Sequence, residues 1–560
     1  MMKTRNTSVL VWSSIHVILI NFACAESLPE EKWTSLFNGR DLNGWSALIG
    51  KLPPGQDPDG HITVKDGEIR MYADAQADAT VPFGSIVSDR SFSRFHLSFE
   101  YAWGVRKFKP RDNAMRDAGF LYHIVDPSKR IAGPWPWSVE CQIQEADTAD
   151  IVCLNTTAVT WMHPDPQSAP AGQGMAGMLP ENGGSPRFCG LGEASHTYIG
   201  RYPEADKLEG WNVVEAIVHA DESAVHIVNG TVRSRMFQIG AKDGTPLRCG
   251  RIGFQLEGAE IAYRNIRVRE LPEPLTVSSR YATCSHVKNL LPGETTLTVT
   301  NPGKQPVDLG LELTGANAKS FTIAVVPEKK FLQPGETATV KVTFIPDGPK
   351  GRYSAGLQIG PRDLGAFVVL QGVALEKLEG ENEPALQSVV DACGIAVDVG
   401  GSELKLDRKA KTIGDGVAVS RFQKAGDGDV RLTPVCRFSP PGAYPVRWVA
   451  DDGKRQEIAT MSSSTAVKDA HQRTFPAFEN GQTFAGFDPA ALPFRIELVA
   501  GKNTATMDGP ETVNSTCRIY PVRSCQGRMM RDSFLICFEE ASNGDYQDAV
   551  FLLENVRPSP

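Results

Sequence analysis

Apolar and polar positions alternate in short runs along most of the chain, and two of these runs carry an unusual set of polar residues. They span residues 116–125 and 138–145. In a strand, residues two apart share a face, so each run has one polar and one apolar edge. The residues that share the polar faces are Asp117, Gly119, Leu121 and His123 in the first run and Glu140, Gln142 and Gln144 in the second. Both runs are predicted to be strands.

The polar faces of these two runs differ from an ordinary solvated sheet face. Solvated faces usually mix Lys, Glu, Thr and Ser. Here the residues are acids, amides and an imidazole, and Trp103, Trp135 and Trp137 lie nearby in the sequence. Carboxylates, amides and aromatic rings are what a sugar-binding face needs. From the two runs alone, a sugar-binding face and a solvated face both remain open.

The rest of the chain follows the same alternating pattern. Gly and Pro punctuate short runs, and helical periodicity is scarce outside residues 384–393. There Leu386, Val389, Val390 and Cys393 follow a helical spacing, between Pro384 and Gly394. A chain of 560 residues is too long for one core, so several domains are expected. The fold class is predicted to be all-β, with several sandwiches.

The N-terminus has the pattern of a signal peptide. Lys3 and Arg5 precede the apolar stretch 9–22, and Ala23-Cys24-Ala25 fits an A-x-A cleavage site. Cys24 could also indicate a lipoprotein, but Asn21 and Phe22 fit a lipobox poorly. We expect cleavage after residue 25 and an exported protein, periplasmic or extracellular.

Composition narrows the class of partner. No second long apolar run follows, so no transmembrane segment is expected in the mature chain. The net charge of −8, with no basic stripe, argues against nucleic acid. Ten cysteines remain after residue 25, an even number that permits disulfides in an exported protein. None of them forms a C-x-x-C pair, so zinc and redox motifs are not expected.

Residues 26–272 contain a series of motifs that resemble one family. The opening signature is Leu36-Phe-Asn-Gly-Arg-Asp-Leu-Asn-Gly-Trp45, and the later motifs are Asp117-Ala-Gly119, Glu140-Cys-Gln-Ile143, Gly210-Trp-Asn212, Val228-Asn-Gly230, Gly253-Phe-Gln-Leu256 and Tyr263-Arg-Asn-Ile266. Together they resemble the 3-keto-disaccharide hydrolase domain. The resemblance implies a concanavalin A-like jelly-roll sandwich whose site lies on the concave sheet. The segment 147–210, rich in Gly and Pro, departs from the family and could form a lid over the cleft.

The resemblance also implies a reaction, the cleavage of a 3-keto disaccharide or a related glycoside. A ketone at C3 acidifies the hydrogen on C2, so a base removes that proton and an acid protonates the leaving oxygen. The predicted proton-transfer residues are Asp117, Glu140 and His123. The predicted substrate-binding residues are Arg116, Gln142, Gln144, Trp211 and Gln255. No cofactor is required for this chemistry.

Three alternatives stay open at this point. Ordinary hydrolysis by paired carboxylates is a variant of the enzyme hypothesis, and it demands a defined carboxylate separation. The family often carries Arg where this chain has His123, so His123 is either an acid/base group or simple drift at a sugar-binding position. The rival to an enzyme is a non-catalytic lectin or a cell-surface adhesion protein, since a jelly roll hosts both activities.

The remaining residues form two further predicted domains. Residues 273–376 resemble an Ig-like β-sandwich, read as a spacer or adhesion module. A charged linker spans 377–383, and residues 384–560 resemble β-sandwich modules of large secreted bacterial proteins. These modules could attach the protein to a cell surface. In the last module Asn543, Asp545 and Asp548 offer hard oxygen ligands for a structural calcium ion, although an acidic turn without metal is the alternative.

Overall fold

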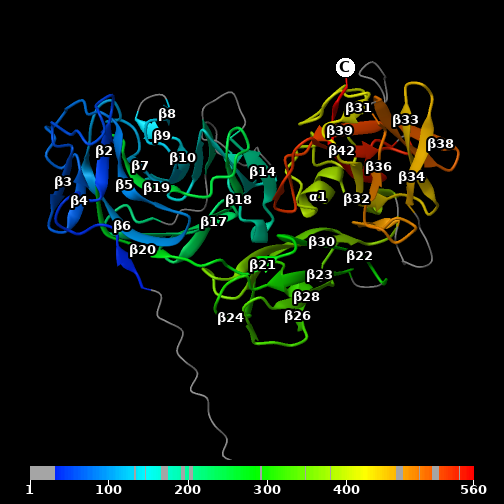
Figure 1. Ribbon diagram of the computed structural model, residues 1–560, viewed down its shortest axis with the longest axis horizontal. Helices are drawn as coiled ribbons and strands as arrows, with labels where there is room; N and C mark the ends of the chain where they lie inside the picture. Colours follow the sequence, from blue (N-terminus) through cyan, green and yellow to red (C-terminus); the bar gives the residue numbers. More distant parts are fainter. Residues whose placement is uncertain are drawn as a thin grey trace, which may run out of the picture.

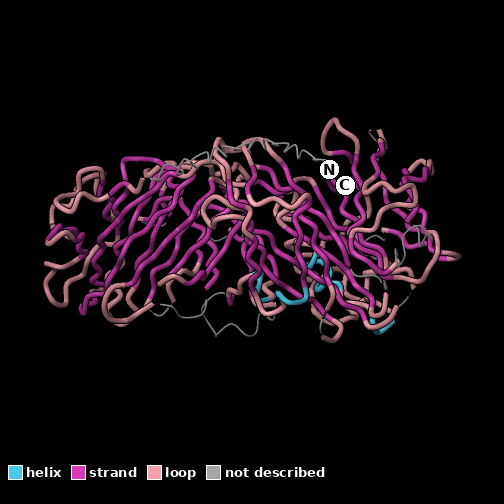
Figure 2. The backbone as a smooth tube through the Cα atoms, turned by 90° about the horizontal axis from the view of Figure 1, so that it is seen from below, coloured by secondary structure: helices cyan, strands magenta, loops and turns pink. Residues whose placement is uncertain are grey.

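The computed structural model describes residues 32–559, except 132–133, 146, 165–174, 191–195, 201–205, 291–292, 347, 379, 462–470, 491, 508–515 and 542. The predicted signal peptide lies outside these residues. Almost all regular structure is strand (Figures 1 and 2), so the all-β prediction is confirmed. In the described part of the chain, no helix is long and apolar enough to cross a membrane.

The first part of the chain forms two packed sheets, drawn blue to green in Figure 1. The ten-stranded sheet consists of β14 (Ser185–Cys189), β12 (Thr156–Met162), β18 (Thr231–Ala241), β17 (Ser223–Val228), β16 (Asn212–His219), β6 (Arg94–Lys107), β20 (Ala259–Glu270), β4 (Glu68–Met71) and β3 (Ile62–Lys65), with β1 (Thr34–Ser35) beside β20. The eight-stranded sheet consists of β13 (Met175–Ala176), β15 (His196–Gly200), β11 (Ile151–Leu154), β10 (Ser138–Gln144), β7 (Asp117–Ile124), β19 (Gly250–Leu256), β5 (Gly84–Phe92) and β2 (Trp45–Ile49). The short strands β8 (Arg130–Ile131) and β9 (Trp135–Pro136) pair antiparallel.

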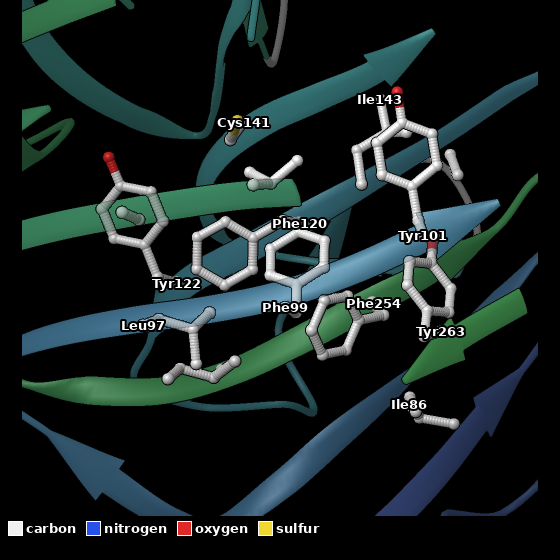
Figure 3. Packing of buried hydrophobic residues seen from close by; sticks show 14 of the residues in the cluster. Ile86, Leu97, Phe99, Tyr101, Phe120, Tyr122, Cys141, Ile143, Phe254 and Tyr263 are labelled. Atoms are coloured by element: carbon white, nitrogen blue, oxygen red, sulfur yellow. The ribbon is translucent and has the colours of Figure 1, made fainter. Parts of the chain in front are cut away.

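Aromatic side chains fill the space between the two sheets (Figure 3). Phe254 of β19 lies 4.9 Å from Phe99 of β6 and 4.7 Å from Tyr263 of β20, measured between ring centroids. Phe120 of β7 joins the same group. Since Phe120 points into this core, its neighbours at 119 and 121 point outward. The core therefore decides which face of the eight-stranded sheet is available to a ligand.

The segment expected as a long loop between residues 147 and 210 is largely a part of the sandwich. It contributes β11, β12, β13, β14 and β15 to the edges of the two sheets. The prediction of a lid is therefore wrong for these strands. Gly and Pro clusters in the segment indicated turns correctly, but short strands between them were missed because each is only two to seven residues long.

A second group of sheets lies between residues 276 and 375, drawn green in Figure 1. Its sheets are β21 (Thr276–Val277), β23 (Gly293–Thr300), β28 (Thr337–Phe344) and β26 (Phe321–Val326); β22 (Tyr281–Val287), β30 (Ala366–Leu375), β29 (Gly351–Ile359) and β25 (Leu311–Thr314); and the pair β24 (Val307–Asp308) and β27 (Phe331–Leu332). One apolar core joins the two larger sheets into a β-sandwich. An Ig-like identity for this sandwich stays a prediction.

A third group follows from residue 422, drawn yellow to red in Figure 1. One sheet consists of β34 (Arg455–Met461), β33 (Tyr444–Ala450), β37 (Phe494–Ala500), β31 (Phe422–Lys424) and β44 (Val556–Pro558), with β38 (Asn503–Thr506) beside β37. A second sheet consists of β35 (Gln472–Thr474), β32 (Val430–Phe438), β43 (Ala549–Glu554), β42 (Ser533–Phe538) and β39 (Cys517–Pro521), with β36 (Ala485–Phe487) beside β32. The strands β40 (Ser524–Cys525) and β41 (Arg528–Met529) form a separate pair.

The α-helix α1 (Leu386–Ala392) confirms the predicted helix. Its apolar residues pack against strands of both the second and the third group. The chain turns at Gly394, whose φ of +65° suits a residue without a side chain. Among the described residues, 3₁₀ turns occur at Pro180–Asn182 (η2), Ala318–Ser320 (η3) and Gly380–Asn382 (η4).

A buried carboxylate, Asp391 of α1, joins the helix to the first and second groups. It accepts a hydrogen bond from Ser185 of β14 and lies 3.5 Å from Arg187 Nη1 of the same strand. Arg352 of β29 lies 3.4 Å from it and also donates to the carbonyl of Gly183. A buried ion network of this kind is costly to break from one side. Removing the first or the second group would leave part of this network unpaired, so experiments on this protein are best done with the full chain.

The ten cysteines after residue 25 are all free thiols in the structure. Nine are buried, and Cys249 is exposed. Burial raises the pKa of Cys141 well above its ordinary value, as expected for an inert thiol in an apolar face. The even number of cysteines therefore permitted disulfides, but the fold does not pair them.

Candidate functional site

The predicted polar faces of β7 and β10 come together on the outer face of the eight-stranded sheet. The strands pair antiparallel, with Gln142 opposite Gly119 and Gln144 opposite Asp117. β19 lies on the other side of β7 and pairs Phe254 with Phe120, which places Gln255 beside Gly119. The structure therefore groups five predicted site residues: Asp117, Glu140, Gln142, Gln144 and Gln255.

Gly119 leaves room at the centre of this group. A Cβ atom there would lie less than 3.0 Å from Gln255 Oε1 and from Glu140 Oε1. The two side chains therefore occupy the space above bare backbone, where Gln255 Nε2 donates a 3.0 Å hydrogen bond to Glu140 Oε2. Any other residue at this position would push them apart.

Three carboxyl groups and one guanidinium form the centre of the site. Asp117 accepts hydrogen bonds from Arg111 and, at 3.4 Å, from Gln144 Nε2. Arg111 Nη1 also lies 3.3 Å from Glu257 Oε2. Asp117 and Glu140 are each only 3% exposed and Glu257 6%. The sequence predictions missed Arg111 and Glu257. Glu257 continues the period of two from Gln255, which could have revealed it, whereas Arg111 lies in a loop without such a signal.

Burial raises the pKa of all three carboxyl groups, and their charged neighbours make the three pKa values differ. It raises the pKa of Glu140 well above its ordinary value, and the charge of Asp117 raises it further. Burial likewise raises the pKa of Glu257, which hydrogen-bonds Asp117. Burial also raises the pKa of Asp117, but Arg111 opposes this effect. Arg111 thus favours the ionised form of Asp117, whereas burial and the neighbouring carboxyl groups favour the protonated forms of Glu140 and Glu257.

Several buried polar atoms on this face have no hydrogen-bond partner within the described residues. They are Asp117 Oδ1, Gln142 Oε1, Gln255 Oε1 and Ser85 Oγ. Ser85 of β5 pairs with Gln255 of β19, so the four unpaired atoms belong to residues on neighbouring strands of the sheet. An unpaired buried polar atom costs about 1–3 kcal/mol. Three of the four atoms can only accept, so a ligand with several hydroxyl donors would satisfy them.

An apolar wall adjoins the polar group on the same face. It consists of Leu48, Val87, Leu121, Ile124, Ile131, Val152 and Leu154, with Trp135 packed against it. The Trp135 ring stacks on Phe83 at 5.8 Å between centroids, and its Nε1 has no partner in the described structure. Trp137 lies on the surface beside Lys129. A site with an aromatic wall next to carboxyl and amide groups suits a sugar ring.

His123 does not join the site, which corrects the prediction that it shares a face with Asp117. The pairing of β19 with β5 and β7 shifts between Arg251 and Gly253, and His123 itself has a φ of +57°. This bulge breaks the alternation after Leu121. His123 Nε2 instead contacts the carbonyl of Ala220, at 3.0 Å. Burial lowers the pKa of His123 to about 4, so the ring is neutral at pH 7.

Two predicted substrate-binding residues also lie elsewhere. Arg116 pairs with Glu145 at 3.0 Å and lies 5.5 Å from the ring of Trp103, which belongs to the inner core. The ring of Trp211 lies under the guanidinium of Arg264, at 3.7 Å. Arg264 of β20 follows the inward-pointing Tyr263, so Trp211 is on the outer face of the ten-stranded sheet, on the far side of the sandwich.

The predicted calcium ligands form a related but different group. Glu539, Asp545 and Asp548 bring carboxylate oxygens within 4.8 Å of one another. Asn543 instead donates its amide to Asp545, so Glu539 takes the place predicted for Asn543. Glu539 Oε2 accepts from the backbone nitrogens of Gly544 and Asp545, whereas Asp545 Oδ1 has no partner in the described residues. These oxygens fit a hard cation, and calcium at this turn stays a prediction.

With this geometry in view, the first sandwich can be compared with known proteins. The model of the 3-keto-alpha-glucoside-1,2-lyase-like domain matches residues 32–269. This match supports the family resemblance over the first two sheets. That sandwich is therefore similar to a carbohydrate-active domain. A search of curated proteins finds no match.

Solved structures align with a similar share of the chain. A putative glycosyl hydrolase from Parabacteroides distasonis is 17% identical, with 43% of this chain and 100% of that chain covered and a TM-score of 0.25. A lichenase from a mouse hindgut metagenome is 10% identical, with 43% and 98% covered and a TM-score of 0.24. A protein of unknown function with a galectin-like fold from Bacillus subtilis is 11% identical, with 43% and 94% covered and a TM-score of 0.23. Scores this low carry no argument about function.

Proposed function

We propose that the outer face of the eight-stranded sheet cleaves 3-keto glycosides, with Asp117 and Glu140 as the proton-transfer groups. The observation that carries the proposal is the cluster of three buried carboxyl groups around the bare backbone of Gly119. The match of residues 32–269 to the 3-keto-alpha-glucoside-1,2-lyase-like domain supports this substrate class.

The different proton affinities of the cluster suit an elimination. Asp117, ionised beside Arg111, removes the proton from C2 of the 3-keto sugar, and the electron pair forms an enolate at the C3 oxygen. Glu140, protonated because it is buried, gives its proton to the glycosidic oxygen as the C1–O bond breaks. Water then adds to the unsaturated sugar, so that the overall result equals hydrolysis.

The remaining polar atoms suit the binding of the substrate. The unpaired oxygens of Gln142 and Gln255 accept hydrogen bonds from sugar hydroxyls. Arg111, whose side chain is 28% exposed, balances the negative charge that the reaction places near Asp117. Glu257 donates to Asp117 and thereby holds its carboxylate in one orientation.

The test is the turnover of a 3-keto disaccharide by the full chain, with an unmodified disaccharide as the reference and products followed by NMR. Asp117→Asn and Glu140→Gln are each expected to reduce turnover about 100-fold or more, the usual scale of a lost proton-transfer group. Glu145→Gln is the matched control. Glu145 is an acid just after β10 that pairs with Arg116 and makes no contact with the cluster.

Two outcomes would contradict the proposal. If Asp117→Asn and Glu140→Gln keep full activity, as the control Glu145→Gln does, the catalytic assignment is wrong. If the parent protein binds glycans but cleaves none, the site is that of a lectin. In that case attachment to a glycan surface through the second and third groups of sheets becomes the better hypothesis.

A further inference from the structure

A cavity lies where the first and third groups of sheets meet, and none of its lining residues belongs to the carboxyl cluster. It has a volume of about 410 Å³, within the usual range of about 300–1,000 Å³ for small-molecule sites. One wall comes from the first sandwich, including Phe188 and the turn 241–244. The other wall comes from residues 521–523, 529–534 and 556–558. Figure 1 shows a red loop of the third group beside β14.

The two walls are held together at the cavity. Arg531 Nη2 donates a 2.8 Å hydrogen bond to the carbonyl of Gly244 across the boundary. The charge of Arg531 also contributes to lowering the pKa of Asp243, after the hydrogen bonds from Thr245. The cavity is therefore a feature of the assembled chain and would not exist in either sandwich alone.

The charges that line the cavity are unlike those of the whole protein. The chain carries a net charge of −8, but the lining has four cations (Lys242, Arg523, Arg531 and Arg557) against two carboxylates (Asp243 and Asp532). Concentrated charge in a concave surface favours a ligand of the opposite sign. The ligand that fits this lining is an anion.

Two of the cations have no other role in the described structure. The side chains of Arg523 and Arg557 make no hydrogen bond or ion pair with any described residue, and both are exposed to solvent. Arg531 by contrast is engaged with Gly244. A pair of unengaged guanidinium groups on one wall of a cavity can bind a carboxylate through paired N–H donors.

The rest of the lining suits the body of a sugar. Phe188, which is half-buried, offers aromatic surface from the wall of the first sandwich, whereas Phe534 is packed mainly into the core of the third group. The carboxylate of Asp532 has no side-chain partner among the described residues, so it can accept hydrogen bonds from hydroxyl groups. Aromatic surface with a carboxylate acceptor and two guanidinium donors matches a ring that carries both hydroxyls and a carboxylate.

We propose that this cavity binds an acidic sugar residue of the uronate type, with Arg523 and Arg557 holding its carboxylate. The anionic character follows from the cavity itself, while the saccharide character rests on the function proposed for the first sandwich. The cavity would then hold an acidic glycan chain on the protein while the separate carboxyl cluster acts on its own substrate.

The test is calorimetric titration of the full chain with trigalacturonate and with the neutral galactotriose of the same linkage. We expect trigalacturonate to bind, more weakly as salt is raised, and the neutral sugar to bind at least tenfold more weakly. Arg523→Ala and Arg557→Ala should each weaken binding of trigalacturonate about tenfold. Arg455→Ala is the matched control, because Arg455 is an exposed arginine of β34 outside the cavity.

The results separate this proposal from the function of the carboxyl cluster. Glu140→Gln should bind trigalacturonate as the parent does, even if it loses turnover, since the two sites are distinct. The proposal is overturned if the neutral sugar binds equally well, if trigalacturonate does not bind, or if both arginine variants bind it like Arg455→Ala. Both arginines are exposed, so thermal melting should show that the variants fold.

Discussion

The role of Gly119 gives the sharpest test of how the site is built. In Gly119→Ala, the new Cβ would lie 2.8 Å from Gln255 Cδ, whereas ordinary contacts begin at 3.4 Å. The side chain of Gln255 must therefore move by at least about 0.6 Å (3.4 − 2.8), and Glu140 must move as well because its Oε1 is also too close. Gly119 does not have a positive φ, so the backbone itself accepts alanine.

Two magnitudes follow from this displacement. Overpacking of a buried position costs about 1–3 kcal/mol of stability. A displacement of catalytic groups that approaches 1 Å reduces turnover by up to about 100-fold. We therefore expect Gly119→Ala to fold with a modestly lower Tm and to lose most of its turnover of a 3-keto disaccharide.

The assay compares Gly119→Ala with Gly104→Ala. A Cβ at Gly104 of β6 would lie 2.6 Å from Glu260 Cδ, so this control is equally crowded but lies in the ten-stranded sheet. Thermal melting and turnover are measured for both variants. If Gly119→Ala keeps the turnover of Gly104→Ala at a similar Tm, then Glu140 and Gln255 do not need their present positions, and the reasoning is refuted.

The remaining predictions concern protonation, calcium and export. His123→Gln should change turnover by less than about threefold and leave the pH profile intact, because His123 faces Ala220; the loss of a limb near neutrality would make it the base after all. Burial lowers the pKa of His123 to about 4 and that of His226 to about 3, from an ordinary value of 6.5. Below pH 6.5 the unfolded chain therefore takes up these protons first, so the free energy of unfolding in urea should fall as the pH drops from 6.5 toward 4. A free energy that does not change with pH would contradict the burial of neutral rings. Calcium at 100 times its dissociation constant should stabilise the full chain by about 2.7 kcal/mol, and chelator should lower its Tm. Asp545→Asn should remove both effects. If neither calcium nor chelator shifts the Tm of the parent, then Glu539, Asp545 and Asp548 form an acidic turn without metal. Without the ion, burial and Glu539 raise the pKa of Asp545 from 3.8 to about 6, so this group's contribution to stability should fall as pH rises through that window. Intact-mass analysis of protein from its host should give a chain that begins at Glu26; retention of Met1 or lipid on Cys24 would refute the predicted cleavage.

The sequence alone determined the local features of the site that depend on alternation. Asp117, Gly119, Glu140, Gln142 and Gln144 share one outer face because side chains in a strand alternate, and the apolar residues between them must face the core. The helix at 386–392 was equally predictable, since its spacing, its proline and its glycine all agree. Such features depend only on residues that are close in the chain.

Only the tertiary structure decided the features that depend on distant residues. His123 does not lie on the outer face with Asp117 because the pairing of β7 with β19 contains a bulge. The sequence pattern of β7 alone does not predict this bulge. Trp211 lies on the far sheet, and this could not be predicted because the alternation within a strand does not show which sheet the strand joins. Arg111 and Glu257 reach Asp117 from other segments, and the raised pKa of Glu140 exists only because those segments bury it. Alternation sets the face of a residue, but strand order, bulges and burial are set by the packing of the whole chain.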